Sequence, residues 1–328
     1  MNLPAGRQVL NFYFLLFSEI SPRIICFSYF EKISYCGCFS TSYASFNTQH
    51  SAFNIQMLIF AAKQKPFMQT VIVPVDFSET SLNAARYAVQ LLTGHYGVNM
   101  ILHHVYEKDA QLGEVTQKLE DLKNELMELG IVKTQLLAEK GDDFIEELEK
   151  LARHRDAELI IMGVAGKSAI AQSIMGSNTL KMVKKKVCPV LIIPEDARYH
   201  DVKNVMLTTD LEDVTSSTPS VPIRKILKTF KPHLFVMNVD NTHYVSLTEE
   251  AQAEKAKLKE MFKDFKPEFF FLGLNDVEEG INQFAQDKKI DFIIIIHKEQ
   301  NLFSKLFVKS RTKKLIYQSQ TPLLVIHE

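Results

Sequence analysis

The chain has 328 residues, of which 46% are hydrophobic and 23% are charged, and its formal net charge is −1. This length suggests two domains of ordinary size, and the composition is that of a globular protein, which excludes a wholly disordered chain. A net charge near zero gives no overall field that would favour nucleic acid or an anionic membrane, so we expect neither as a partner.

Residues 1–67 differ from the rest of the chain in composition. They hold 14 Phe and Tyr side chains but only seven charged ones, and they sustain no helical or strand period. The apolar run 9–17 is too short to span a bilayer. Arg7 before it leaves a signal peptide as an alternative, although no small-x-small cleavage site follows. Because Met68 opens a strand-like stretch, we interpret residues 1–67 as an N-terminal extension, either a poorly ordered tail or the product of a misassigned start codon.

Short apolar runs and helical patterns alternate along residues 68–198. The runs are rich in Val, Ile and Leu, as expected of strands that are buried on both faces of a parallel sheet. Strands are predicted near 70–76, 99–106, 133–139, 158–163 and 189–194, and helices near 80–93, 112–129, 142–154 and 176–186. This alternation predicts an α/β domain with a doubly wound, five-stranded parallel sheet and right-handed crossovers.

Capping residues set the expected ends of these helices. Ser78 or Glu79 can open the first helix, and Asp142 can cap the third by accepting backbone N–H groups. Gly130 follows the second helix, where a left-handed C-cap is expected.

The second part of the chain repeats the first. Three strands recur in the same order at offsets of 134, 134 and 133: 71–76 as 205–210, 159–163 as 293–297, and 189–193 as 322–326. The repeat indicates an internal duplication and predicts a second α/β domain over 199–328. Its strands are expected near 203–209, 233–239, 268–273, 291–296 and 322–327, and its helices near 217–230, 247–264, 277–287 and 305–317.

A glycine pattern carries the chemistry of the first domain. Gly163-Val-Ala-Gly166, nine residues and then Gly176-Ser177 follow an apolar strand and lead into a helix. Ligands of doubly wound sheets bind beyond the carboxyl ends of the strands, where a glycine lets the backbone approach a phosphate. Free N–H groups at a helix start favour anions, and Ser177 adds a hydroxyl. The spacing therefore predicts a cradle for a triphosphate.

This pattern, ending in Cys-Pro-Val-Leu-Ile-Ile at 188–193, resembles that of the universal stress protein family. Val-Pro-Val-Asp-Phe-Ser at 73–78 is similar to the opening strand of that family, and Leu-His-His-Val at 102–105 to its second strand. The resemblance covers about 68–195 well and 203–328 more loosely. It implies a tandem member with Rossmann-like domains of the adenine nucleotide alpha hydrolase type. It also implies ATP as the ligand, with Mg²⁺ left open.

The resemblance further implies which residues meet the ligand. Pro74 and Asp76, from the opening strand, would line the adenine and ribose end, and Val105 would contact adenine through its backbone. The phosphates would meet the glycine loop and the start of the next helix, at Gly163, Gly166, Gly176, Ser177 and Asn178.

Each assignment has a structural alternative. Asp76 could only cap the helix that follows it, Ser177 could be only an N-cap, and the glycines could be turn residues without a ligand. His103 and His104 fit the inward and outward positions of a strand better than they fit a metal site.

The second domain lacks the glycine pattern. At the offset of 134 the four residues of the loop and helix start are replaced: Gly163 by His297, Gly166 by Gln300, Gly176 by Ser310 and Ser177 by Arg311. Asp210 survives, but an aspartate without a phosphate loop makes a poor nucleotide site. We therefore expect a structural or regulatory role for this domain and no ATP.

The last strands of the two domains are candidates for a pseudo-dimer. Members of the family that the chain resembles commonly dimerise through these strands. Val190–Ile193 against Leu323–Ile326 would satisfy that pairing inside one chain, and open apolar edges would otherwise invite aggregation. A homodimer stays open.

These observations predict an ATP-binding stress-response or signalling module with an unidentified protein partner. We expect weak ATP hydrolysis at most, because no catalytic base, metal motif or nucleophile elbow is evident. A nucleotidyl-transfer enzyme of the same α/β class and a protein-binding scaffold that keeps the loop as a relic stay open. Cys188 is the single cysteine of residues 68–328, which fits the reducing cytoplasm.

Overall fold

The structure is a computed structural model that describes residues 68–164, 176–239, 248–272, 277–297 and 321–328. All of these residues belong to one unit that spans 65–328. We call residues 68–198 the first half and residues 199–328 the second half, a division that follows the sequence repeat and stays a prediction. The expected helix at 305–317 and the extension 1–67 lie outside the described residues.

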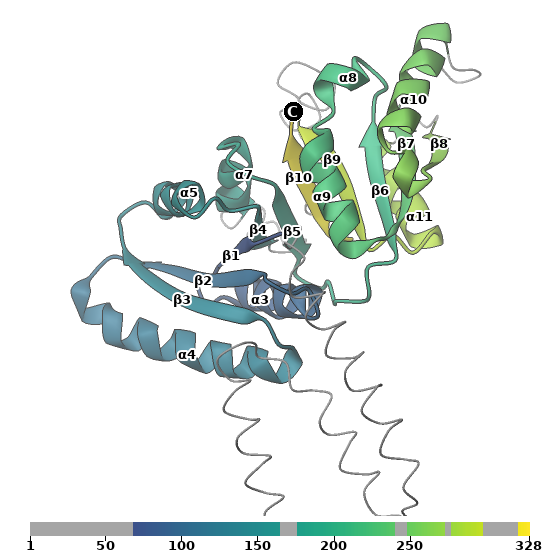
Figure 1. Ribbon diagram of the computed structural model, residues 1–328. Helices are drawn as coiled ribbons and strands as arrows, with labels where there is room; N and C mark the ends of the chain where they lie inside the picture. Colours follow the sequence, from purple (N-terminus) through teal and green to yellow (C-terminus); the bar gives the residue numbers. More distant parts are fainter. Residues whose placement is uncertain (1–67, 165–175, 240–247, 273–276, 298–320) are drawn as a thin grey trace, which may run out of the picture. The chain divides into compact units, whose positions relative to one another are not determined.

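The first half contains the nine strands and helices that the sequence predicts (Figure 1). The strands are β1 (Thr70–Pro74), β2 (Asn99–Tyr106), β3 (Lys133–Lys140), β4 (Leu159–Val164) and β5 (Val190–Pro194). The helices are α3 (Glu79–Leu92), α4 (Leu112–Leu129), α5 (Phe144–His154) and α7 (Gly176–Lys184), with a 3-10 turn at Asp109–Gln111.

Two expected helix caps are corrected by the structure. Asp143, and not Asp142, is the N-cap of α5, because its carboxylate accepts hydrogen bonds from the backbone of Ile145 at 2.8 Å and Glu146 at 3.1 Å. Gly130 does follow α4, but its φ of 177° is extended and not left-handed. A Cβ at Gly130 would meet Thr93 Oγ1 at 2.1 Å, so the glycine permits a close approach between two segments.

The second half repeats the alternation. Its strands are β6 (Asn204–Thr209), β7 (His233–Val239), β8 (Glu268–Leu272), β9 (Phe292–His297) and β10 (Leu323–His327). Its helices are α8 (Val214–Ser217), α9 (Ser220–Phe230), α10 (Glu249–Met261) and α11 (Val277–Asp287), with a 3-10 turn at Lys263–Phe265. The helix expected near 217–230 is present as α9, but it begins at Ser220, and the separate short helix α8 before it was not expected. Thr218 is extended, as a residue that precedes a proline favours, and Pro219 follows it.

The ten strands form one sheet in the order β3-β2-β1-β4-β5-β10-β9-β6-β7-β8. Within each half every pairing between described strands is parallel, as predicted. β5 and β10 join the halves as an antiparallel pair, with Leu323 opposite Ile192 and Val325 opposite Val190. The expected pairing between the last strands is therefore observed.

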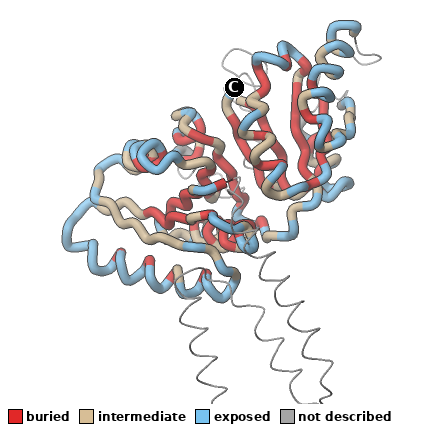
Figure 2. Tube along the Cα trace, viewed as in Figure 1, coloured by how far each residue is buried: buried red, intermediate tan, exposed pale blue. Residues whose placement is uncertain are grey.

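Two hydrophobic clusters cover the two faces of the sheet. Neighbouring β1 residues alternate between them: Val71 and Val73 join the cluster with α3 and α4, whereas Ile72 joins the cluster with α5 and α7. The inner strands are largely buried and red in Figure 2, whereas the edge strands β3 and β8 are partly buried or exposed. This agrees with a sheet covered by helices on both sides. The loops that follow the strands, and the first turns of the helices, therefore meet at the carboxyl ends of the strands, which we call the carboxyl edge of the sheet.

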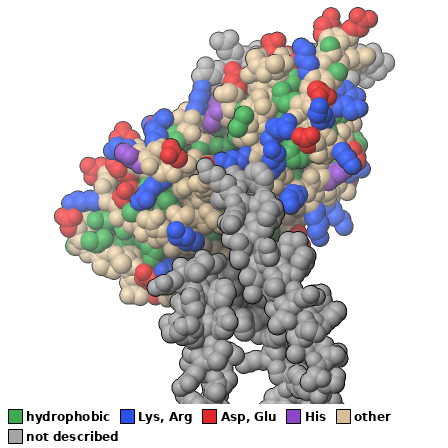
Figure 3. All heavy atoms as spheres, in the orientation of Figure 1, with side chains coloured by type: hydrophobic (Ala, Val, Ile, Leu, Met, Phe, Trp, Pro, Cys, Tyr) green, Lys and Arg blue, Asp and Glu red, His purple; other side chains and the backbone are tan. Residues whose placement is uncertain are grey.

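Positive and negative side chains are mixed on the face of the described part that Figure 3 shows. Among the described residues, no helix is both long enough and apolar enough to cross a membrane.

Candidate functional site

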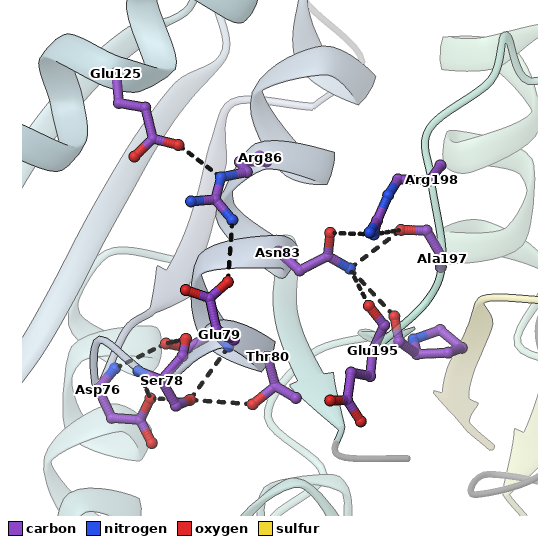
Figure 4. A network of polar contacts seen from close by, with 12 residues as sticks. Asp76, Ser78, Glu79, Thr80, Asn83, Arg86, Glu125, Glu195, Ala197 and Arg198 are labelled. Carbon is purple, nitrogen blue, oxygen red and sulfur yellow. Dashed lines mark hydrogen bonds and ion pairs between the residues drawn. The ribbon is translucent and has the colours of Figure 1, made fainter. Parts of the chain in front are cut away.

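The loop between β1 and α3 holds Asp76 in a fixed turn (Figure 4). Its Oδ1 accepts hydrogen bonds from the backbone N–H of Ser78 at 3.0 Å and from the Ser78 hydroxyl at 2.5 Å. Phe77 between them is left-handed, with φ at 63°, a conformation that is uncommon for a bulky residue. Ser78 then serves as the N-cap of α3 and accepts from Ser81 N. Asp76 therefore orders the turn, and Ser78 is the residue that caps the helix.

The carboxylate of Asp76 is ionised at neutral pH. Burial beside the loop would raise its pKa, but the hydrogen bonds from Ser78, with a further contribution from Ser81, outweigh burial and lower the pKa below its ordinary value. The residue as a whole is exposed, so this negative charge reaches solvent at the carboxyl edge of the sheet.

The same turn is present in the second half. Oδ1 of Asp210 accepts from the backbone of Glu212 at 3.1 Å, and Leu211 between them has a φ of 56°. The aspartate and its left-handed neighbour are thus features of the duplicated fold. They do not by themselves distinguish a half that binds a ligand from one that does not.

Gly163 lies within β4, against the first turn of α3. A Cβ there would meet Thr80 O at 2.2 Å and Thr80 C at 2.7 Å, both of which are backbone atoms. The structure therefore requires glycine for contact with α3. The approach of a phosphate, for which the sequence predicts glycine here, stays a prediction.

The start of α7 is tied to the same point. Thr179, in the first turn of α7, is buried, and its hydroxyl donates to the carbonyl of Gly163 at 3.2 Å. Asn178 beside it is exposed. Because Thr80 and Thr179 both contact Gly163, the β1–α3 loop, the end of β4 and the start of α7 meet at one place. Gly176 and Ser177 begin α7, as predicted, whereas Gly166 lies outside the described residues.

The end of β2 adjoins the β1–α3 loop. Val75 donates its N–H to His103 O at 2.8 Å, and its carbonyl lies 2.7 Å from His104 Nδ1. The ring of Phe77 packs on that of His104, with centroids 4.8 Å apart. Val105 is the next residue and is partly buried, and Pro74 is buried within β1. The carboxyl ends of three neighbouring strands, β1, β2 and β4, therefore bring together four of the predicted residues: Pro74, Asp76, Val105 and Gly163.

Buried His103 and partly exposed Glu139 form a pair on the α5 side of the sheet. Nε2 of His103 lies 2.8 Å from Glu139 Oε2, and His103 is fully buried. Burial lowers the pKa of His103, although Glu139 and Glu147 both act in the opposite direction. Among the described residues, no group of three or more His, Cys, Asp or Glu side chains could hold a metal ion.

A side chain occupies the position of Gly163 in the second half, but it is Ile296 and not His297 as the offset of 134 predicted. Val71 pairs with Leu159 and Val205 pairs with Phe292, so β9 matches β4 at an offset of 133. The helix that follows β6 is also broken there into α8 and α9, whereas α3 is continuous. The close contact between strand and helix that Gly163 permits in the first half is thus a property of the half with the glycine pattern.

Two partners of the site were missed from the sequence. Ser81 accepts from the N–H of Asp76 at 3.3 Å, and Thr179 binds Gly163. Ser81 lies inside the first turn of α3 and Thr179 inside that of α7, where hydroxyls often bond local backbone. That placement was the only available signal.

Comparison with known proteins agrees with this architecture. The model of the universal stress protein family matches residues 68–194 and 233–327. Universal stress protein MJ0531 of Methanocaldococcus jannaschii is 24% identical over 137 residues, which cover 38% of this chain and 80% of that protein. MJ0577 of the same organism is 28% identical over 158 residues, which cover 38% and 93%.

A solved structure also shares the fold over most of the chain. The universal stress protein from Archaeoglobus fulgidus DSM 4304 covers 80% of this chain and 98% of its own, with a TM-score of 0.55 and 15% identity. That identity is low, so the match speaks for the fold alone. The family model, in contrast, matches well over half of the chain and both halves of the repeat. The chain therefore belongs to the universal stress protein family.

Proposed function

We propose that the first half binds ATP at the carboxyl edge of β1, β2 and β4, and that the protein acts as a stress-response or signalling module. The observation that carries the proposal is the meeting of three elements at Gly163. Thr80 of the α3 start contacts it, Thr179 of the α7 start binds its carbonyl, and β4 supplies it.

The start of α7 gives this edge a place for phosphate. The first N–H groups of a helix have no partner within the helix and carry the positive end of its dipole. Gly176 and Ser177 supply the first of them, and Asn178 follows at an exposed position. In the proposed complex the phosphates lie between this helix start and the loop of Gly166.

The β1–α3 loop and the end of β2 would hold the nucleoside. Asp76 presents an ionised carboxylate that suits ribose hydroxyls, since carboxylates accept strong hydrogen bonds. Pro74 and Val105 line the neighbouring strand ends, with the backbone of Val105 facing adenine. Mg²⁺ would enter with the triphosphate, because the described residues offer no cluster of three ligands for it.

The second half stays without nucleotide in this proposal. Asp210 keeps its turn there, but Ile296 occupies the position of Gly163 in the strand register. The antiparallel pair of β5 and β10 supports an internal pseudo-dimer, and a homodimer of the whole chain remains a second arrangement. We also propose a cytoplasmic location, which the free and buried Cys188 supports.

Nucleotide that is retained by the purified full-length protein tests the proposal. Denaturing the protein and separating the released compounds should yield adenine nucleotide, close to one per chain at saturation. No bound nucleotide and no binding of added ATP would favour the protein-binding scaffold. ATP turnover well above background would instead favour an enzyme of the same α/β class.

A further inference from the structure

The connection between the two halves is fastened to α3, the helix that carries the candidate nucleotide loop (Figure 4). The amide nitrogen of Asn83 lies 3.2 Å from Pro194 O, 3.1 Å from Glu195 O and 3.1 Å from Ala197 O. Its oxygen accepts from Arg198 Nη1 at 3.0 Å. We call these contacts the Asn83 latch.

The latch is specific for an amide. An Asn side chain offers two N–H donors and a carbonyl acceptor, so its nitrogen can serve a group of carbonyls while its oxygen serves a cation. The opposite orientation would set the Asn83 oxygen against three carbonyl oxygens. The turn that it holds is itself closed by the Ala197 N–H, which donates to Pro194 O at 3.0 Å.

A second contact lies one turn further along the same face of α3. Tyr87 is buried, and its ring meets that of Tyr199 edge-on, with centroids 5.5 Å apart. Burial raises the pKa of Tyr87, and the carboxylate of Asp291 in the second half adds to the shift. Residues four apart lie on one helix face, so Asn83 and Tyr87 together hold the connection along one side of α3.

The connection is fastened at its far end as well. Oδ2 of Asp291, which precedes β9, accepts from the backbone of Lys203 and Asn204, both at 2.7 Å. The segment 194–204 therefore runs from a point held by α3 to a point held by the second half. These bonds fix both ends of the segment.

α3 is one continuous helix from Glu79 to Leu92. Asp76 and Ser78 form the turn at its start, and Asn83 follows little more than one helical turn later. A shift of the helix start must therefore carry Asn83 with it, because an intact helix moves as a rigid element. Arg86 Nε, 2.6 Å from Glu125 Oε1, also ties α3 to α4.

We propose that the Asn83 latch couples nucleotide occupancy of the first half to the connection 194–204, and so makes the second half a nucleotide-responsive element. The inference rests on the proposed function. ATP at the Asp76 loop fixes the start of α3, and the fixed helix holds the latch closed. Coupling is reciprocal: if bound ATP shifts the latch toward its closed form by some factor, opening the latch lowers the affinity for ATP by the same factor.

Hydrogen exchange of peptides from 194–204, with and without ATP, tests the coupling in the full chain. We expect ATP to slow exchange there about fivefold or more, the lower range for coupled sites. Asn83→Ala should remove this response and raise the Kd for ATP by about the same factor. Asn83→Asp keeps the size of the side chain but replaces the N–H donors by an oxygen that cannot bond the three carbonyls, so it should have the same two effects. Gln90→Ala, on α3 but without a described bond to the connection, should respond as the wild type does.

Calorimetry on the same samples separates the two levels of the account. ATP that binds with heat but leaves exchange of 194–204 unchanged overturns the latch and spares the proposed function. No heat with ATP overturns both. An equal response in the wild type and in both Asn83 variants, each shown to be folded by its melting curve, overturns the role of Asn83.

Discussion

Replacement of Gly163 by alanine tests how the candidate site is assembled. The added Cβ would lie 2.2 Å from Thr80 O and 2.7 Å from Thr80 C. Ordinary contacts between such atoms are more than 3 Å, so the first turn of α3 would have to withdraw by roughly 1 Å. Thr80 contributes backbone atoms here, which cannot rotate away as a side chain could.

Forcing extra atoms into a packed site typically costs about 1–3 kcal/mol. Because backbone must move, we expect Gly163→Ala to lie in the upper half of this range, about 2–3 kcal/mol. For a chain of this size each kcal/mol lowers the melting temperature by about 2–4 °C, so the expected shift is about 4–12 °C. Displacing the start of α3 should also lower the affinity for ATP, because the Asp76 turn leads directly into this helix.

Gly113→Ala is the matched control. Gly113 lies in the first turn of α4, and a Cβ there meets nothing within 4 Å. Alanine is favoured over glycine in a helix by up to about 1 kcal/mol, so this variant should be as stable as the wild type or slightly more stable. Both variants would be compared by urea and thermal unfolding of the full chain. A Gly163→Ala protein that melts within 1–2 °C of Gly113→Ala would refute the close contact described above.

Three further changes test other parts of the account. Burial, then His297 and Lys186, lower the pKa of His327 from 6.5 to about 4. The contribution of neutral His327 to the free energy of unfolding should therefore be fully present above pH 6.5 and, after allowance for solvent screening, fall by about 1–2 kcal/mol toward pH 4. Urea unfolding of His327→Gln should lack this loss. Asp76→Asn keeps the acceptor of the turn but removes the charge, so calorimetry should show a Kd for ATP about tenfold higher, whereas an unchanged Kd would remove Asp76 from the site. Asp143→Ala should lower the melting temperature more than Asp142→Ala, and the reverse order would contradict the observed cap of α5.

Much of the fold was predictable because it depends on local patterns. Buried parallel strands form continuous apolar runs, and the repeat at 134 residues doubles each signal. The pairing of β5 with β10 was implied by the resemblance to the universal stress protein family, and the need to cover two apolar edges supported it. The misplaced N-cap of α5 lies where two neighbouring residues could both cap the helix. Asp142 and Asp143 are equally good caps by type, and only the backbone geometry chooses between them.

The candidate site was predictable in outline but not in its packing. The glycine spacing indicated where β4 ends and α7 begins, and both agree with the structure. The contact of Gly163 with Thr80 joins residues more than 80 positions apart, so no local pattern could reveal it. Asn83 gave no signal either, since a single amide on a helix acquires its role only when the connection folds back onto it.

Titration of the full chain with ATP by calorimetry tests the central claim most directly, with one matched substitution in each half. Gly166→Asp places a charge in the proposed phosphate loop, and Gln300→Asp places the same charge in the second half, at the position that the sequence offset of 134 pairs with Gly166. The account predicts one site per chain, lost in Gly166→Asp and unchanged in Gln300→Asp. Two sites per chain, or a loss of binding in Gln300→Asp with Gly166→Asp intact, would contradict it.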